Sequence, residues 1–124
     1  MSKMCARRLE GMAAPGDRIL IVKPCWLQLI LSGAKTMEIR GTAYRPGKYW
    51  LGHQRQILAV AQLGKPLRVS TPEQWISLQP QHRVMRSDLP YKNTFALPIE
   101  SVRPVSPFPF RHPRGAINIV RYRP

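Results

Sequence analysis

One segment carries most of the information about the fold: Gly33-Ala34-Lys35-Thr36-Met37-Glu38-Ile39-Arg40. The amphipathic run that precedes it, residues 24–32, predicts a short helix. Pro24 suits the first helical position, where its missing N–H costs nothing, and Gly33 suits the left-handed residue just past the end. A strand is expected to follow this turn.

Alternation with a period of two divides that strand between two faces. Met37 and Ile39 lie on the face that we expect to enter a core. The opposite face is polar and carries Thr36, Glu38 and Arg40. Lys35 sits at the turn before the strand, and we expect its side chain to be free to swing toward the same polar face. The segment therefore brings an ammonium, a hydroxyl, a carboxylate and a guanidinium to one groove.

The spacing Gly-x-Lys-x-x-Glu-x-Arg resembles the signature of the ASCH domain, a family of the PUA-like β-barrel class. Flanking segments are similar to other parts of that family. Residues 19–26 resemble its opening strand and Lys/Arg-Pro-x-Trp turn, residues 45–51 its next strand, and residues 112–116 with the alternation after them its closing strand. The resemblance covers residues 18–122, although 65–93 carry no motif. It implies a small α+β fold, a mixed PUA-like β-barrel with two or three short helices.

A chain of 124 residues is long enough for one modest core and too short for two. We expect a flexible N-terminal arm over 1–17, read as a disordered tail or as an organellar targeting piece, and a single ASCH/PUA-like domain over 18–124. No run approaches the ~18 apolar residues of a spanning helix, and no secretory h-region is seen at the N-terminus. The sequence therefore predicts an intracellular protein, cytoplasmic or nuclear, without a membrane partner.

Alternation also predicts a hairpin of strands 48–53 and 56–63, joined across Gly52-His53-Gln54-Arg55. In its first strand Tyr49 and Leu51 should face opposite to Trp50. In its second strand one face should carry Ile57, Ala59, Ala61 and Leu63, and the other Leu58 and Val60. The hairpin tip brings a His and an Arg to one end of the barrel.

The second half of the chain is rich in proline. Thr71 to Gln74 has the form of a capping box, which predicts a short helix with Trp75, Ile76 and Leu78 inward, stopped by Pro80. Because proline cannot donate to a ladder, we expect separate strands near 95–97 and 99–105, broken at Pro98 and at Pro104, Pro107 and Pro109. An alternating strand over 115–122 should close the barrel.

Charge is the strongest feature of the composition: 20 Lys and Arg face 6 Asp and Glu, which gives +14 and a pI of 11.1. A domain that repels itself to this degree usually has a polyanionic partner. We expect RNA first and DNA second; solubility or habitat is the alternative. Basic residues that are scattered, not stacked along one helix, disfavour a membrane surface. Cys5 and Cys25 have no metal or disulfide spacing, so we expect no metal and no cofactor, and a buried or half-buried structural thiol at Cys25.

In the PUA-like class RNA is thought to lie in the groove beside the first helix. The resemblance therefore implies a nucleic-acid site made of Lys23, Trp26, Lys35, Glu38, Arg40, Arg45 and Lys48. Trp26 fits either the core or the edge of the groove. Glu38 has two roles open to it: it accepts from a base amino group, or it orients Lys35 and Arg40 as a structural ion pair.

The resemblance also permits an enzyme, because some ASCH-like proteins are amidohydrolases that act on acetylated cytidine and others are ribonucleases. In the amidohydrolases the Lys activates a Thr nucleophile, and this chain has Glu38 where that Thr would stand. If the protein is an enzyme, Lys35 and Glu38 are the catalytic candidates, with Glu38 as a general base on water and Lys35 polarising an oxygen. A ribonuclease would draw on His53 or His112, although His112 more simply bonds a loop. A nucleoside ligand and a protein-interaction module remain alternatives.

Overall fold

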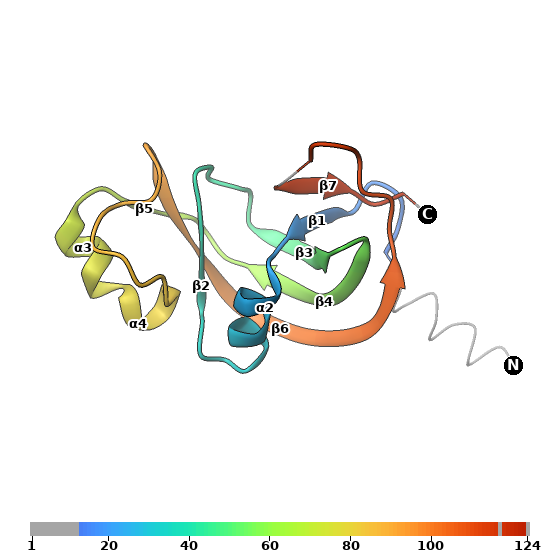
Figure 1. Ribbon diagram of the computed structural model, residues 1–124, viewed down its shortest axis with the longest axis horizontal. Coiled ribbons are helices and arrows are strands. Elements are labelled where there is room, and N and C mark those ends of the chain that lie inside the picture. Colours follow the sequence, from blue (N-terminus) through green and yellow to red (C-terminus); the bar gives the residue numbers. More distant parts are fainter. Residues whose placement is uncertain (1–12, 117, 124) are drawn as a thin grey trace, which may run out of the picture.

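The computed structural model describes residues 13–116 and 118–123 and shows three short helices and seven strands (Figure 1). In chain order these are β1 (Arg18–Ile21), α2 (Pro24–Leu31), β2 (Met37–Arg40), β3 (Gly47–His53), β4 (Gln56–Leu63), β5 (Leu67–Val69), α3 (Pro72–Ser77), α4 (Gln79–His82), β6 (Thr94–Pro109) and β7 (Ile119–Arg121). The predicted small α+β fold is confirmed.

The strands form one curled sheet in the order β2-β6-β4-β3-β1-β7, with β5 also paired to β6. β1 and β3 are parallel, and the other pairs are antiparallel. β2 and β7 are the two ends of this order, and no ladder joins them among the described residues. The predicted closing strand over 115–122 is wrong in length, because β7 has only three residues. The result is a half-barrel with an open seam, visible in Figure 1 between β2 and the β1–β7 pair.

The β3–β4 hairpin has nearly the predicted bounds. Its turn residues Gln54 and Arg55 have φ of 49° and 63°, the left-handed pair whose twist suits a two-residue hairpin. Tyr49 and Trp50 enter different clusters, as predicted. The predicted face of Ile57 is wrong: the register shifts between Ile57 and Ala59, which moves Ile57 to the side of Trp50.

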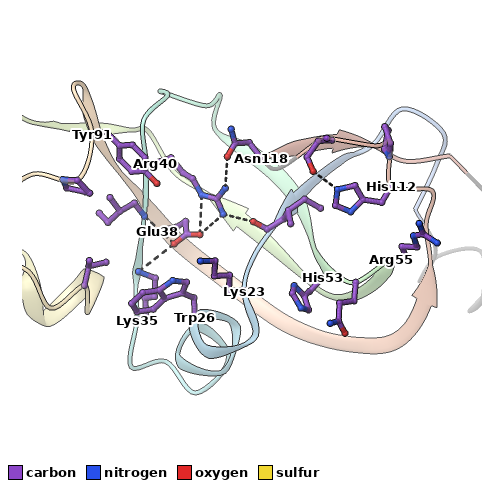
Figure 2. A pocket seen from close by; sticks show the side chains of 18 of the residues that line it. Lys23, Trp26, Lys35, Glu38, Arg40, His53, Arg55, Tyr91, His112 and Asn118 are labelled. Carbon is purple, nitrogen blue, oxygen red and sulfur yellow. Dashed lines mark hydrogen bonds and ion pairs between the residues drawn. The ribbon is translucent and has the colours of Figure 1, made fainter.

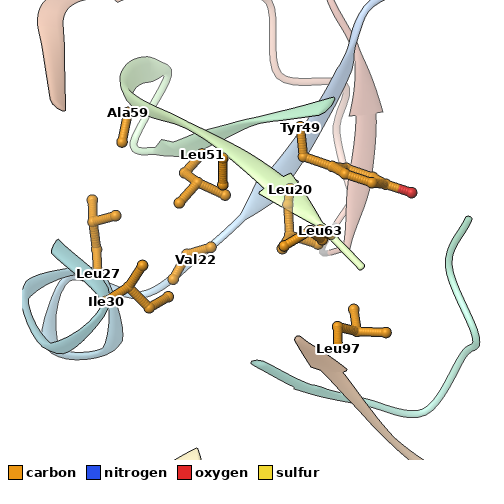
Figure 3. Close-up of a cluster of buried hydrophobic side chains, with 10 residues drawn as sticks. Leu20, Val22, Leu27, Ile30, Tyr49, Leu51, Ala59, Leu63 and Leu97 are labelled. Atoms are coloured by element: carbon orange, nitrogen blue, oxygen red, sulfur yellow. The ribbon is translucent and has the colours of Figure 1, made fainter. Parts of the chain in front are cut away.

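The main core lies between α2 and the concave face of the sheet (Figure 3). Its buried members are Leu20, Val22, Leu27, Ile30, Tyr49, Leu51, Ala59, Ala61, Leu63 and Leu97. A second cluster around Ile19, Trp50 and Ile57 fills the other face, and a third joins Ile39 of β2 to Val69 and Trp75. The curled sheet therefore has apolar clusters on both faces, and α2 covers one of them.

β6 is a single strand of 16 residues, so the predicted break into separate strands is wrong. Over residues 99–109 its ladder is with β4 alone. In this part of β6, a backbone nitrogen that points away from β4 has no neighbouring strand to donate to. A proline is therefore tolerated at such a position, as it is on an edge strand. Register shifts near Ile57 and Leu63 let this long strand bend around the barrel.

Residues 71–93 form a small lobe beside β2. Thr71 caps α3, because its hydroxyl accepts from the backbone N–H of Gln74 at 3.1 Å. Trp75 is fully buried as predicted, but Ile76 is 45% exposed, so that part of the prediction is wrong. Pro80 does not end the helical region; it stands in the first turn of α4, where a proline is tolerated.

The described part of the expected arm, residues 13–17, packs on the domain. Ala13 is buried in the second cluster, and the Asp17 carboxylate accepts from the Trp50 indole N–H at 3.0 Å. The rest of the expected arm, 1–12, lies outside the described residues. None of the helices in the described ranges has the length and apolar character needed to cross a membrane.

Candidate functional site

A pocket of about 1010 Å³ opens along the seam of the half-barrel (Figure 2). Its wall comes from β2, the start of α2, the tip of the β3–β4 hairpin, residues 84–91 and the loop before β7. The lining residues are Ile21, Lys23, Trp26, Lys35, Glu38, Ile39, Arg40, His53, Gln54, Arg55, Val84, Arg86, Pro90, Tyr91, His112, Pro113, Arg114, Gly115, Ala116 and Asn118. The pocket therefore collects segments that are far apart in the sequence.

Glu38 lies at the centre of a charged cluster in this pocket and is only 5% exposed. One carboxylate oxygen, Oε2, accepts from Arg40 Nη2 at 2.8 Å and from Arg40 Nε at 3.3 Å. The other, Oε1, accepts from the backbone N–H of Ile39 at 3.2 Å and lies 3.6 Å from Lys35 Nζ. Of the two roles left open for Glu38, the structure shows the ion pair with both cations.

Lys35 is 1% exposed, so the expectation of a freely swinging side chain is wrong. Its ammonium donates to the His82 carbonyl and lies 4.7 Å from the centre of the Trp26 ring. Burial lowers the pKa of Lys35, and the neighbouring Glu38 carboxylate opposes this by favouring the charged form. Lys35 is therefore a desolvated amine at the pocket wall, held in one position.

The lobe formed by α3 and α4 fixes Lys35 through its backbone. The N–H of Thr36 donates to the Gln81 carbonyl at 2.8 Å, and Arg83 Nε donates to the Ala34 carbonyl at 3.1 Å. Together with the bond from Lys35 Nζ to the His82 carbonyl, these contacts hold the residues on both sides of Lys35. Sequence reasoning missed this support, because 65–93 carried no motif.

His82, whose carbonyl accepts from Lys35, is fully buried, and its hydrogen bonds indicate a neutral ring. Its Nδ1 accepts from the Val84 backbone N–H at 2.9 Å, so the ring proton is on Nε2, which donates to the Trp75 carbonyl at 3.0 Å. The imidazole stacks on the Trp75 ring at a centroid distance of 3.8 Å. Burial lowers the pKa of His82, which agrees with a neutral ring that uses both nitrogens.

Arg40 bridges the seam that the backbone leaves open. Besides its bonds to Glu38, its Nη2 donates to the Ile21 carbonyl at 2.6 Å and its Nη1 to Asn118 Oδ1 at 3.4 Å (Figure 2). β2 and the β1–β7 pair are thus joined by a side chain where a closed barrel would have a ladder. The guanidinium suits this position because its fork of donors reaches several acceptors at once.

The pocket contains five of the seven residues predicted for the nucleic-acid site: Lys23, Trp26, Lys35, Glu38 and Arg40. Arg45 and Lys48 do not line it. The Arg45 carbonyl accepts from Tyr49 Oη at 2.8 Å. Lys48 Nζ lies 4.8 Å from the centre of the Trp50 ring and 3.9 Å from Asp17 Oδ2. Both residues lie near the start of β3, whereas the pocket is lined by the tip of the β3–β4 hairpin. Their closeness in sequence to Arg40 therefore did not place them in the pocket.

Both candidate histidines line the pocket, and His112 Nε2 donates to the Ala116 carbonyl as expected for a residue that holds a loop. Thr36, which was expected on the polar face, is not part of the wall. Cys25 is exposed, contrary to the expected buried or half-buried thiol. Among residues 13–116 and 118–123, no three His, Cys, Asp or Glu side chains gather as a metal site would require.

Several residues of the pocket wall have no motif or clear periodicity around them in the sequence. Tyr91 lies in a loop, and its ring passes so close to Gly41 that a Cβ there would meet it at 3.1 Å. Asn118 lines the pocket and accepts a hydrogen bond from Arg40. Arg86 and Arg114 also line the pocket from loops. Their positions depend on how the lobe and the last loop fold back over β2.

Comparisons with known proteins give a fold. No protein-family model matches the chain, and no curated protein matches it. The crystal structure of ASCH from Zymomonas mobilis superposes with a TM-score of 0.68 at 15% identity, covering 87% of this chain and 88% of that chain. A serine-to-alanine mutant of that protein gives 0.68 and 15% over 89% and 92% of the two chains. A tyrosine-to-phenylalanine mutant gives the same score and identity over 87% and 91%. The protein described here therefore has the small α+β fold of ASCH from Zymomonas mobilis.

Proposed function

We propose that this protein binds RNA, or a nucleotide-like ligand, in the seam pocket. The observation that carries the proposal is the charge of the wall. In the part of the chain that the structure describes, six cationic residues line the pocket, Lys23, Lys35, Arg40, Arg55, Arg86 and Arg114, against the single carboxylate of Glu38. Six positive and one negative side chain leave five net positive charges around one hollow.

A concave site lined by one sign of charge concentrates field lines and attracts an oppositely charged ligand. Arginine also matches the geometry of phosphate, which it binds through two parallel N–H donors. The whole chain, at +14, adds a long-range attraction to a polyanion. A phosphodiester chain satisfies both requirements, because it presents one negative charge for each nucleotide.

Aromatic side chains in the same pocket support a ligand with bases. Trp26 and Tyr91 both line the wall, and in the view of Figure 2 the Glu38 carboxylate is drawn between them. Single-stranded RNA is recognised largely by stacking unpaired bases on such rings and by reading their edges. We therefore place single-stranded RNA ahead of a duplex and ahead of DNA.

The test is equilibrium binding of a fluorescent single-stranded RNA to the full chain at several salt concentrations. Trp26→Leu and Tyr91→Leu should each weaken binding by about 5- to 100-fold, the range for one lost base stack. Tyr44→Leu is the matched control, since Tyr44 does not line the pocket. Failure to bind RNA, or an equal loss for the control, would contradict the proposal. A protein-interaction module would instead show binding to an acidic polypeptide such as polyglutamate that RNA does not compete away.

A hydrolase is the second candidate, and one observation favours it: Lys35 has a pKa lowered by burial and contacts a carboxylate at the pocket wall. Shifted amines of this kind are typical of catalytic sites. Under this alternative Glu38→Gln abolishes turnover of acetylated cytidine or RNA and leaves ligand binding nearly intact. If the wild-type protein turns over either substrate and Glu38→Gln does so equally well, Glu38 has no catalytic role.

A further inference from the structure

We infer that Lys23, Arg55 and Arg114 form a phosphate-binding rim, distinct from the buried Lys35-Glu38-Arg40 cluster of the same pocket. The ligand class is a nucleoside phosphate, or one phosphodiester next to a bound base. This inference rests on the proposed function and assigns different parts of the ligand to the two ends of the pocket.

The cations of the pocket fall into two groups by their partners. Lys35 and Arg40 are both held by Glu38. Arg86 is held by Asp88 through bonds of 3.1 and 3.0 Å. For the side chains of Lys23, Arg55 and Arg114, by contrast, no hydrogen bond or ion pair is formed within residues 13–116 and 118–123. These three carry the part of the positive charge that nothing in the described structure neutralises.

Three different segments bring this group together, and each has a fixed backbone. Lys23 is the N-cap residue of α2, directly after β1. Arg55 is a turn residue at the hairpin tip, and its carbonyl accepts from the Phe110 N–H at 3.0 Å. Arg114 lies in the loop that the bond from His112 to the Ala116 carbonyl closes. The side chains are exposed, but the positions from which they reach the pocket are set by the fold.

Figure 2 shows where Lys23 and Arg55 lie relative to the buried cluster. Lys35, Glu38 and Arg40 lie at one end with Trp26 and Tyr91. Arg55 lies toward the other end near His53 and His112, and Lys23 is drawn between the two ends, on the side of Glu38. A ligand that spans the pocket therefore meets aromatic rings and two cations that already share the Glu38 carboxylate at one end. Toward the other end it meets cations that have no partner among the described residues.

Chemistry assigns the parts of a nucleotide to these ends. A buried cluster whose cations already share a carboxylate has little capacity left for an anion, whereas it can present polar edges to a base. Exposed Arg and Lys side chains keep their hydration until they meet a phosphate, which Arg binds with two donors and Lys as a point charge. The base is thus directed to Trp26 and Tyr91, and the phosphate to the rim.

The experiment compares nucleosides with nucleotides on single variants. The probes are the four ribonucleosides and their 5′- and 3′-monophosphates, with affinities measured by calorimetry for the wild-type chain and for Lys23→Gln, Arg55→Gln and Arg114→Gln. Lys65→Gln and Arg103→Gln are the controls, because each removes one positive charge from a residue that does not line this pocket. Thermal unfolding of every variant checks that the fold is intact.

We expect the wild-type protein to bind at least one monophosphate more tightly than its nucleoside. The rim variants should each lose several-fold in affinity for that monophosphate, keep the nucleoside affinity, and reduce the salt slope for single-stranded RNA by about 0.7 per contact. The controls should change neither. If rim variants weaken nucleoside and monophosphate equally, or weaken neither, the phosphate rim is wrong while the proposed function stands. If no nucleoside, monophosphate or RNA binds, both are wrong.

Discussion

Arg40 Nη2 donates a 2.6 Å hydrogen bond to the carbonyl of Ile21, across a seam where no ladder of the described residues joins β2 to the β1–β7 pair. The same nitrogen lies 2.8 Å from Glu38 Oε2. One guanidinium therefore holds the carboxylate of its own strand and the backbone of another. This makes Arg40 both a part of the pocket wall and a support of the half-barrel.

Replacement of Arg40 should destabilise the fold. Arg40→Ala leaves the buried Glu38 carboxylate without its main partner and the Ile21 carbonyl without a donor, and we expect a loss of about 3–5 kcal/mol in the free energy of unfolding. Arg40→Lys keeps the charge but not the fork of donors, so it should recover only part of the loss. Denaturant unfolding measures both. Arg86→Ala is the control: its ion pair with Asp88 is exposed, and we expect a much smaller change.

Lys35 and Glu38 should differ in their effect on stability. Glu38→Gln leaves two cations close together without a compensating charge, which we expect to cost about 3 kcal/mol. Lys35→Met fills the same space with an apolar chain and leaves Glu38 paired to Arg40. It should cost less than Glu38→Gln, because burying the ammonium was itself unfavourable, although the His82 carbonyl loses its donor. Unfolding of the two variants side by side tests this order, and a larger loss for Lys35→Met would contradict it.

Because His82 is buried, we expect the free energy of unfolding to fall in mild acid. Burial lowers the pKa of this imidazole in the folded protein from its ordinary value of 6.5. Below pH 6.5 the unfolded chain takes up a proton that the folded protein does not, so the stabilising contribution is complete above that pH and is lost as pH falls toward the lowered value. The slope is at most about 1.4 kcal/mol per pH unit for one proton. Unfolding between pH 5 and 8 should show this slope, and His82→Gln should remove that part of it.

Gly52 marks a close approach in the second hydrophobic cluster. A Cβ at this position would lie 2.9 Å from Phe110 Cε1 and 3.0 Å from Ile19 Cγ2. Since both neighbours are buried, the added methyl should force them apart and cost about 1–3 kcal/mol. Gly52→Ala tests this by thermal unfolding. Its crystal structure should show a shifted Phe110 ring, and an unchanged melting temperature would show that the cluster relaxes freely.

Local patterns were sufficient for the first half of the fold. The Pro24 and Gly33 signals predicted α2, and alternation predicted the bounds of β4, because both depend only on residues adjacent in sequence. Two predictions for the second half were wrong: the described strands do not close the barrel, and β6 is one continuous strand. A proline interrupts a strand only if its backbone nitrogen faces a neighbouring strand. Which strands are neighbours depends on the sheet order, and the sequence alone does not give that order.

In the candidate site, too, only the features that depend on neighbouring residues in the sequence were predicted. Glu38 and Arg40 were predicted on one face because a strand alternates, and they do share the pocket. The burial of Lys35 was missed because it depends on the His82 carbonyl, 47 residues away. Asn118, 78 residues from Arg40, was missed for the same reason. Side-chain periodicity predicts which residues point together, whereas tertiary contacts decide which of them remain exposed to solvent.

The length of β6 has a consequence for cooperativity. This one strand supplies Leu97 to the first hydrophobic cluster, Phe108 to the second and Ala96 to the third. Each cluster also has its own tryptophan: Trp26 packs on the first, Trp50 lies in the second and Trp75 in the third. Because a shared strand prevents one cluster from melting while the others persist, the tryptophan fluorescence of each single-tryptophan variant should give the same midpoint as circular dichroism of that variant, and the lobe at 71–93 should have no independent thermal transition.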